Sequence, residues 1–370
     1  MKIVVDRTIP YLKGVVEAFA EVRYLSAAEF TAQNVREADV LIVRSVEKCT
    51  AELLENSRVK LIATATIGFD HIDTAYCEAA GIAWRNAPGS NAASVAQYVA
   101  ATLVATSLLR REPLKGKTVG IVGVGHVGRQ VERVCAALGL RILRNDPPRA
   151  EAEGEDGFVS LDVIAEEADI ISFHTPLVTK GKHATYHLAG GDFFRRLKKM
   201  PWLINTARGA VHDTAALLDA KKRGWAGELI LDCWENEPEV NRELLGLATI
   251  ATPHIAGFSA DGKANASRMC LENIGDFFHI NIEKAGKITP LPPREPVVDM
   301  KRFKEYRVEQ AILSAFNPAA VDRAFRENPS AFERFRAHYD YPREYPAYTV
   351  IHATEEEAAL LARLGFRIGL

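Results

Sequence analysis

The sequence is short of the residues that mark secreted, metal-binding and redox proteins. Its five cysteines are odd in number and lack the spacing of a metal site, which argues against a disulfide framework and a structural metal. Each falls in a segment that we expect to be strand or helix. We therefore expect small core residues in a reducing compartment, and no bound metal. They are Cys49, Cys77, Cys135, Cys233 and Cys270.

Excess charge and long apolar runs are also lacking. The formal net charge of the 370 residues is −2 at pH 7, which argues against a polyanion-binding surface and so against nucleic acid. There is no N-terminal apolar signal segment, and no run approaches the length of a membrane span. We therefore expect a cytoplasmic protein without membrane or nucleic-acid partners, long enough for two or three domains.

What the sequence does have is a glycine motif in residues 117–128. An apolar, β-branched run ends in Gly123-x-Gly125-x-x-Gly128. In such a motif the first glycine allows a tight turn, the second lets backbone approach a pyrophosphate, and the third lets a helix pack on the strand. On its own, a glycine triplet is also compatible with a simple tight turn.

The residues around this motif extend the pattern. A helical pattern runs from His126 to about Leu138, so the N–H groups of His126 and Val127 would face the phosphates. A second strand then leads to Asp146, about twenty residues on. Asp146 would accept both ribose hydroxyls of NAD and repel the extra phosphate of NADP. The stretch predicts a dinucleotide site for NAD.

Apolar strands alternate with helices along most of the chain, which predicts parallel sheets covered on both faces. Examples are a helix over residues 12–20 and a long apolar helix over 92–109. A proline-rich linker precedes the C-terminal segment. We expect an α/β fold with two doubly wound parallel-sheet domains and a small C-terminal α/β unit. The expected ranges are a discontinuous substrate domain at 1–92 and 258–285, an inserted Rossmann-type NAD domain at 93–257, and the C-terminal unit at 286–370.

Arg208, Glu237 and His254 stand out near the expected ends of strands. With the motifs around them, the sequence over about residues 1–285 resembles the D-2-hydroxyacid dehydrogenase family, which carries an arginine, a glutamate and a histidine in this order. The supporting motifs are Pro88-Gly89-x-Asn91, the segment 119–128, His174-Thr175-Pro176-Leu177, Asn205-Thr206-Ala207-Arg208-Gly209, the segment 231–238, and Pro253-His254-Ile255-Ala256-Gly257.

The three residues suit the chemistry that this resemblance implies. Oxidising a 2-hydroxy acid requires a base for the hydroxyl proton, a cation for the carboxylate and a hydride acceptor. His254 suits the base, Glu237 can hold its imidazole in one tautomer, and Arg208 can grip the carboxylate with its forked guanidinium. Taken singly, such a histidine is more often structural and a lone arginine more often a surface ion pair.

The resemblance implies further site residues. Thr175, Asp232 and Gly257 would contact the cofactor. Ser45 and Thr66 would line the substrate side, as would Phe258. Arg44 is either a phosphate ligand or a structural arginine, and both interpretations stay open.

One group within the family acts on a small phosphorylated 2-hydroxy acid and dimerises through a C-terminal extension. Its signatures resemble this sequence, which departs from them at Phe258, where the resemblance leads us to expect tyrosine. We therefore expect a homodimer formed through residues 286–370. The similar segments are Val43-Arg44-Ser45-Val46, residues 63–71, Asp146-Pro147-Pro148-Arg149-Ala150 and residues 233–239.

Two alternatives remain. In the first alternative, the protein is an enzyme of the same family that acts on another acid, such as 3-phosphoglycerate, glyoxylate or hydroxypyruvate. The other alternative is an NAD(H)-sensing scaffold, since the same fold serves that purpose.

Overall fold

The computed structural model describes residues 1–282 and 288–369. The chain divides into two compact units. The first comprises Met1–Asn91 and Ser259–Leu291, and the second comprises Ala92–Phe258 and Pro292–Leu370. The C-terminal segment thus groups with the segment that carries the glycine motif, and the three-domain division of the sequence analysis stays a prediction.

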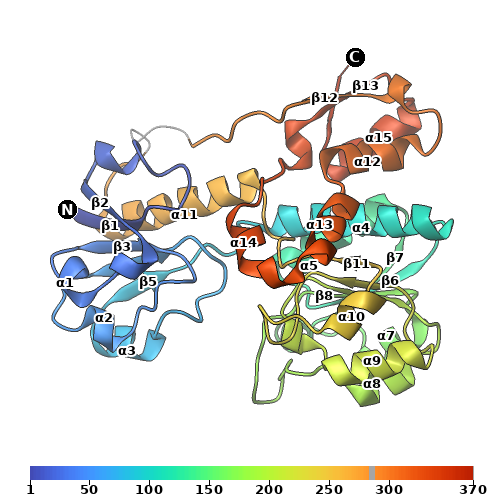
Figure 1. Ribbon diagram of the computed structural model, residues 1–370, viewed down its shortest axis with the longest axis horizontal. Coiled ribbons are helices and arrows are strands. Elements are labelled where there is room, and N and C mark those ends of the chain that lie inside the picture. Colours follow the sequence, from blue (N-terminus) through green and yellow to red (C-terminus); the bar gives the residue numbers. More distant parts are fainter. Residues whose placement is uncertain (283–287, 370) are drawn as a thin grey trace. The chain divides into compact units, whose positions relative to one another are not determined.

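The first unit is built on a five-stranded parallel sheet in the order β2-β1-β3-β4-β5. One face packs on helix α11 and the other on α1, α2 and α3 (Figure 1). The strands are β1 (Lys2–Asp6), β2 (Glu21–Leu25), β3 (Val40–Val43), β4 (Leu61–Thr64) and β5 (Ala83–Arg85), and the helices are α1 (Ala32–Val35), α2 (Ala51–Leu54), α3 (Thr74–Ala79) and α11 (Ala260–Phe278).

The prediction of a helix over residues 12–20 is wrong. Only a 3₁₀ turn forms there, over Val16–Ala18. Tyr11 and Gly14 have φ angles of 67° and 85°, and a left-handed conformation cannot continue a right-handed helix. Short-range hydrogen bonds of turns replace the helical pattern.

The second unit contains a six-stranded parallel sheet in the order β11-β10-β9-β8-β6-β7. β7 lies on one side of β6, and β8 to β11 follow one another on the other side. The strand order therefore reverses at β6, and its carboxyl end is a topological switch point, where open α/β sheets bind ligands. The strands are β6 (Thr118–Val122), β7 (Arg141–Asn145), β8 (Ile170–Phe173), β9 (Trp202–Asn205), β10 (Leu229–Leu231) and β11 (Ile250–Ala251).

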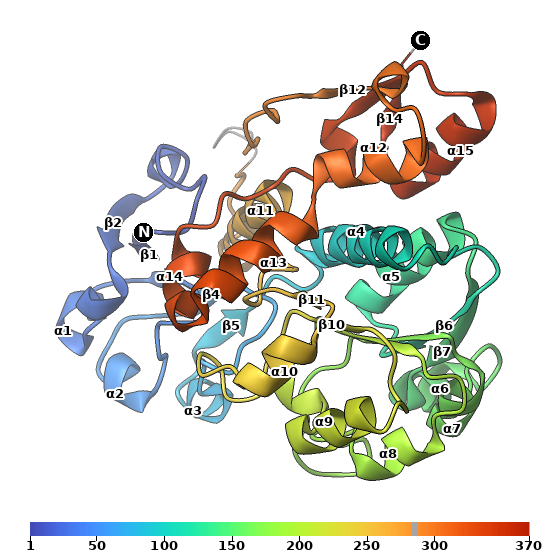
Figure 2. The same ribbon diagram turned by 45° about the vertical axis from the view of Figure 1, so that its right-hand side comes forward.

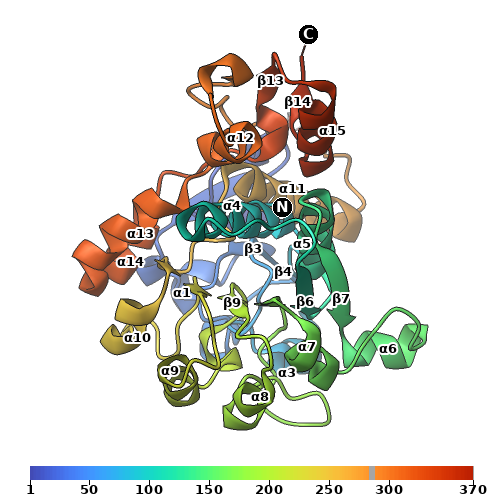
Figure 3. The same cartoon turned by 90° about the vertical axis from the view of Figure 1, so that its right-hand side faces the viewer.

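Helices cover both faces of this sheet (Figure 3). One side packs on α4 and α5, and the other on α7 to α10. The predicted parallel-sheet α/β architecture is therefore confirmed. The helices are α4 (Ala92–Arg110), α5 (His126–Ala137), α6 (Pro147–Glu153), α7 (Leu161–Glu167), α8 (Gly191–Arg196), α9 (Thr214–Lys222) and α10 (Arg242–Leu247).

In the part of the chain that the structure describes, the C-terminal segment adds a three-stranded parallel sheet and the helices α12 to α15 to the second unit. Helices α12 and α13 contact α4, and α15 contacts α5 (Figure 2). Asn317 caps α13, and Thr354 forms a capping box on α15. The elements are β12 (Val297–Asp299), α12 (Arg307–Ala315), α13 (Pro318–Glu327), α14 (Phe332–Ala337), β13 (Thr349–Ile351), α15 (Glu355–Leu364) and β14 (Arg367–Ile368).

Helix α4 corrects the statement that no run approaches a membrane span. An 18-residue window of it has a mean hydropathy of 1.5, enough by length and composition to cross a membrane. However, 72% of that window is buried inside the structure. A helix that is apolar all round is expected where protein covers every side. Here the sheet and the C-terminal segment together cover α4.

Candidate functional site

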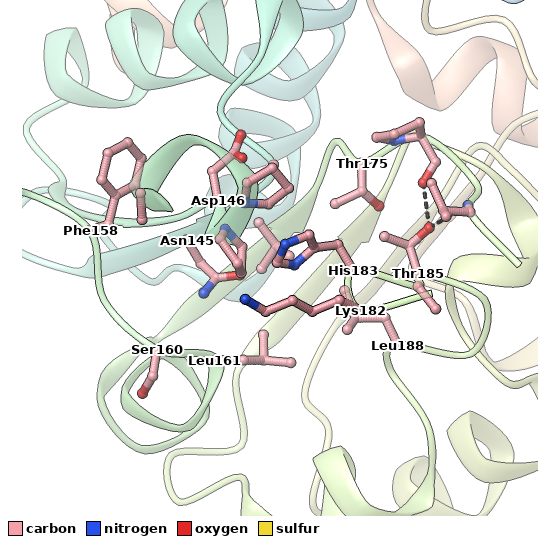
Figure 4. Close-up of a pocket in the computed structure, with 18 of the residues that line it drawn as sticks. Asn145, Asp146, Phe158, Ser160, Leu161, Thr175, Lys182, His183, Thr185 and Leu188 are labelled. Atoms are coloured by element: carbon pink, nitrogen blue, oxygen red, sulfur yellow. Dashed lines mark hydrogen bonds between the residues drawn. The ribbon is translucent and has the colours of Figure 1, made fainter. Parts of the chain in front are cut away.

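A cavity of about 620 Å³ opens beside the carboxyl ends of β6, β7 and β8 (Figure 4). Gly123, Asp146 and Thr175 follow these three strands and line it. The other walls are formed by α6, the start of α7 and residues 176–188. Three of the sequence-predicted cofactor residues therefore meet at the switch point of the sheet.

The three glycines of the motif have three different surroundings. A Cβ atom on Gly123, whose φ is +88°, would lie 2.8 Å from the backbone of His174. A Cβ on Gly128 would lie 2.1 Å from the carbonyl oxygen of Gly123. A Cβ on Gly125 would meet nothing within 4 Å. The protein itself requires glycine at the first and third positions, whereas the second leaves open space in which a dinucleotide can approach the backbone.

Helix α5 begins directly after this turn. Gly125 is its N-cap and has no side chain to bind the helix N–H groups. The first-turn amides, which include those of His126 and Val127, lack acceptors within a helix. They and the helix dipole favour an anion at this end, as the sequence analysis predicted.

Asp146 and Thr175 occupy different walls of the cavity (Figure 4). Asp146 accepts hydrogen bonds from the backbone N–H groups of Val124, at 2.8 Å, and Arg149, at 3.2 Å. Its carboxylate is therefore fixed beside the glycine turn, and each oxygen retains a lone pair for a ribose hydroxyl. The buried hydroxyl of Thr175 has no hydrogen-bond partner among the described residues. Such an atom suits a polar group of a bound dinucleotide.

His254 and Glu237 form a hydrogen-bonded pair in the second unit. Nδ1 of His254 lies 2.8 Å from Oε2 of Glu237. The other carboxylate oxygen accepts the backbone N–H of Trp234 at 2.7 Å. With both oxygens engaged, the carboxylate is fixed and directs the ring, which leaves Nε2 of His254 for a substrate proton.

Asp232 holds the loop that carries His254. Its side chain is fully buried. One oxygen accepts the N–H of Ile255 at 2.8 Å and the hydroxyl of Thr252 at 2.6 Å, and the other accepts the N–H of Ala256 at 2.9 Å. Burial raises the pKa of Asp232, an effect that the charge of His254 and these hydrogen bonds oppose. In this position the carboxylate binds the backbone of the His254 loop. Its direct contact with the cofactor stays a prediction.

Arg208 lies on a turn that touches the segment leading to Glu237. Asn205 shapes this turn, since its side chain binds the carbonyl of Arg208 and the N–H of Ala207. A Cβ on Gly209 would lie 1.9 Å from the backbone of Trp234, so only glycine allows so close an approach. Nη1 of Arg208 donates to the carbonyl of Ala207 at 2.8 Å, which orients the half-buried guanidinium.

Sequence reasoning missed the residues of α4, and Thr252 directly after β11, that support the His254 loop. Ser94 donates to the carbonyl of Ala256 at 2.8 Å, and the hydroxyl of Tyr98 lies 2.6 Å from that of Thr252. The indole of Trp234 donates to the carbonyl of Thr252 at 2.9 Å. These contacts join segments far apart in sequence, so no local pattern indicates them.

Cys233 lies beside the His254–Glu237 pair. Ligand-type atoms of these three residues lie within 4.8 Å of one another. Burial raises the pKa of the Cys233 thiol well above its ordinary range, and a protonated thiol is a poor metal ligand. The predicted absence of a metal stays a prediction. All five cysteines are buried and free, as expected.

The substrate-side residues of the first unit also lie at strand ends. Ser45 is exposed after β3, and Thr66 is half-buried after β4. Arg44 pairs with Asp6, with Nε and Oδ2 2.5 Å apart, and Asp6 is fully buried. Arg44 thus has a structural partner at the ends of β1 and β3, and its role as a phosphate ligand stays a prediction.

Phe258 and Gly257 follow the His254 loop in the second unit. The N–H of Phe258 bonds to the carbonyl of Ile255 at 2.8 Å and closes a turn around Gly257. The ring of Phe258 packs on Tyr339 and Tyr341 of the C-terminal segment. The contact of Gly257 with cofactor stays a prediction.

Comparison with known proteins places this geometry in a family. The family model described as D-isomer specific 2-hydroxyacid dehydrogenase, NAD binding domain, matches residues 85–256. The chain is 50% identical over 367 residues to erythronate-4-phosphate dehydrogenase of Porphyromonas gingivalis, covering 99% of this chain and 100% of that protein. It is 49% identical over 352 residues to the Bacteroides thetaiotaomicron enzyme of the same name, covering 95% and 99%. The chain belongs to the D-isomer specific 2-hydroxyacid dehydrogenase family.

Solved structures agree with this family. D-lactate dehydrogenase of Aquifex aeolicus, complexed with NAD and lactic acid, matches with a TM-score of 0.61 and 27% identity, covering 75% of this chain and 96% of that chain. NAD⁺-bound 3-phosphoglycerate dehydrogenase of Entamoeba histolytica matches with a TM-score of 0.63 and 28% identity, covering 76% and 97%. The predictions of an NAD-dependent 2-hydroxyacid dehydrogenase and of NAD as cofactor are confirmed at the level of this family.

Proposed function

We propose that this protein oxidises the 2-hydroxyl of 4-phospho-D-erythronate to 2-oxo-3-hydroxy-4-phosphobutanoate with NAD, in the biosynthesis of pyridoxine. The observation that carries this proposal is the 50% identity over the whole length of a relative with that activity in its name. The His254–Glu237 pair, 2.8 Å apart, is consistent with the reaction.

His254 is the general base of the proposed reaction. The Glu237 carboxylate accepts the Nδ1–H, so Nε2 carries the lone pair that takes the proton of the substrate 2-hydroxyl. Glu237 then stabilises the imidazolium that forms. In the reverse direction the same nitrogen returns the proton to the carbonyl oxygen.

Arg208 binds the substrate carboxylate in this account. Its guanidinium carries a permanent charge and paired N–H donors that match a carboxylate. When bound at the switch-point cavity, NAD supplies the acceptor for the hydride from C2 of the substrate. Gly125, the α5 amides, Asp146 and Thr175 would hold it there.

We also propose that the protein is a cytoplasmic homodimer formed through residues 286–370. The C-terminal segment leaves Tyr306 and Ile368 exposed on its own surface, and exposed apolar side chains favour association. Sedimentation of the intact chain tests the dimer.

A steady-state screen with NAD tests the proposed substrate. The substrates are 4-phospho-D-erythronate, D-erythronate, 3-phospho-D-glycerate and D-glycerate, with glyoxylate and hydroxypyruvate assayed with NADH. The proposal expects the highest kcat/KM for 4-phospho-D-erythronate. A higher value for 3-phosphoglycerate or glyoxylate would assign another activity of the family. No turnover of any substrate would favour the NAD(H)-sensing scaffold.

A further inference from the structure

Arg336 is an arginine of the C-terminal segment that the proposed mechanism does not use. It lies on α14, with 25% of its side chain exposed. Its guanidinium lies over the rings of Phe258 and Phe332, 5.5 and 5.7 Å from their centroids. Stacking on two aromatic rings fixes the direction of a side chain that otherwise has many rotamers.

The hydrogen bonding of this guanidinium is incomplete. Nη1 lies 3.2 Å from Oε1 of Glu333, one turn earlier, and Glu333 is 65% exposed. The buried Nε–H has no hydrogen-bond acceptor among the described residues. An exposed ion pair contributes little, whereas a buried N–H without an acceptor is unfavourable. The side chain is therefore suited to accept an anion.

Arg336 also lies near the catalytic loops of the second unit. Phe258, on which it stacks, closes the turn that follows His254. Burial raises the pKa of Cys233, and the charges of both Arg208 and Arg336 oppose that rise. The charges of both guanidinium groups thus act on the Cys233 thiol. Cys233 precedes Trp234 and lies close to the His254–Glu237 pair.

Arg44 is the competing candidate for a phosphate, and its surroundings differ. Its Nε is paired with the fully buried Asp6, and its backbone N–H bonds to the buried Glu47. The charge of Arg44 is therefore already paired with one buried carboxylate, that of Asp6. The only carboxylate paired with Arg336 among the described residues is the largely exposed Glu333.

We propose that Arg336 binds the phosphate group of the substrate, so that the C-terminal segment supplies the specificity for a phosphorylated 2-hydroxy acid. This inference rests on the proposed function. A substrate with a carboxylate at one end and a phosphate at the other then meets Arg208 with the first and Arg336 with the second. A guanidinium suits this role because its planar N–H donors match two phosphate oxygens.

The inference gives Phe258 a physical role. The resemblance led us to expect a tyrosine there, with a hydroxyl toward the substrate. A phenylalanine ring offers only its face and edge, and here its face supports the Arg336 cation. Phe258 is in this account a positioning residue for Arg336.

The test compares Arg336→Gln with wild type in steady-state assays. We expect KM for 4-phospho-D-erythronate to rise about 10- to 100-fold, the usual range for a lost charge-assisted hydrogen bond. The kcat/KM for D-erythronate, which has no phosphate, should stay within about twofold of the wild-type value. Inorganic phosphate should inhibit wild type competitively and inhibit Arg336→Gln about tenfold more weakly. Arg336→Lys, which keeps the charge without the fork, should fall between them.

Arg334→Gln is the matched control, because Arg334 is an exposed arginine on the same helix. It should leave KM for both substrates unchanged. Circular dichroism and the affinity for NADH confirm that each variant is folded.

Three results would overturn the inference. One is an equal loss toward both substrates, which would mean a structural role. Another is unchanged phosphate inhibition of Arg336→Gln. The third is a phosphate-specific loss in Arg44→Gln alone. If wild type itself shows no preference for the phosphorylated acid, the proposed function fails, and the phosphate inhibition still decides whether Arg336 binds the anion.

Discussion

Oδ1 of Asp232 accepts the backbone N–H of Ile255 at 2.8 Å, so a buried carboxylate fixes the residue that follows His254. The other oxygen accepts the N–H of Ala256. Both bonds end on the loop that carries the proposed base. The position of His254 therefore depends on Asp232 as well as on Glu237.

Asp232→Asn tests this role. An amide replaces one acceptor oxygen by an NH₂ group, which leaves one loop N–H facing another donor. We expect the variant to lose about 1–3 kcal/mol of stability and to lower kcat, with KM for NAD within about twofold of wild type. Thermal unfolding and steady-state rates measure these quantities. A selective rise in KM for NAD, with unchanged kcat and stability, would instead support direct contact with the cofactor.

Asp146 should determine the choice of cofactor. Its carboxylate is fixed on the cavity wall by the N–H of Val124. We expect NAD to bind more tightly than NADP by on the order of 2–4 kcal/mol. NADP would lose the hydrogen bonds of its ribose to Asp146, and its extra phosphate would be repelled by the carboxylate. Asp146→Asn should narrow this gap, whereas Asp156→Asn, at an exposed loop position, should not. Fluorescence titrations with NADH and NADPH decide it, and equal affinities in wild type would contradict the assignment.

The glycine motif offers a matched pair of variants. Gly125→Ala places its Cβ in open space, and Gly128→Ala places it 2.1 Å from the carbonyl oxygen of Gly123. We expect Gly125→Ala to keep the melting temperature and to bind NADH at least about tenfold more weakly, because its methyl group meets the pyrophosphate. Gly128→Ala should lower the melting temperature by several degrees, since about 1–3 kcal/mol is typical of overpacking. Tight NADH binding by Gly125→Ala would show that the dinucleotide lies elsewhere.

Glu47 makes the stability of the first unit depend on pH. Burial raises its pKa to about 7, and the charge of Asp6 adds to the rise, against the N–H and guanidinium of Arg44. In the unfolded chain a glutamate has a pKa of about 4.3. Between these pH values the folded protein holds a proton that the unfolded chain has released, so the free energy of unfolding falls as pH rises.

Glu47→Gln should remove this dependence. We expect it to stabilise the protein by on the order of 2 kcal/mol at pH 8 and by almost nothing at pH 4. Urea unfolding at both pH values measures the difference, with the exposed Glu52→Gln as control. The same gain at both pH values would mean that the carboxyl does not titrate in this window.

The sequence predicted the elements whose determinants are local. Gly123, Gly125 and Gly128 have fixed spacing, and the helix after them begins at His126 as expected. The capping box of Thr354 and Glu357, which fixes the start of α15, is also local. In these cases the residues that decide the conformation lie within one or two turns of each other.

The rest depends on contacts between distant segments. The bonds from Asp232 to the His254 loop exist because β10 and β11 pair in the sheet. Likewise, Arg336 meets Phe258 only after the C-terminal segment has folded onto the second unit. The apolar character of α4 was visible in the sequence, but the segment that covers its outer side was not. The absent helix over residues 12–20 shows that periodicity also fails where a glycine adopts a positive φ.

The central claim is that His254 exchanges the substrate proton while Glu237 stabilises its charged form. Glu237→Gln removes that charge. It also leaves one of two donors, the Trp234 N–H or the His254 Nδ1–H, without an acceptor, because both oxygens of Glu237 are engaged. The maximal rate should therefore fall, but the pH at which the rate is half-maximal reports the charge separately.

The most direct measurement is the pH–rate profile of wild type and Glu237→Gln in both directions. Oxidation needs the neutral imidazole and reduction needs the protonated one. Because the amide no longer stabilises the protonated ring by charge, both half-maximal points should move to lower pH. Glu235→Gln is the control, because Glu235 lies in the same loop and pairs with another histidine, His187, at 2.6 Å. Its half-maximal points should stay in place. Unmoved points in Glu237→Gln, or an equal shift in Glu235→Gln, would contradict the assignment of His254 and Glu237 as the proton-transfer pair.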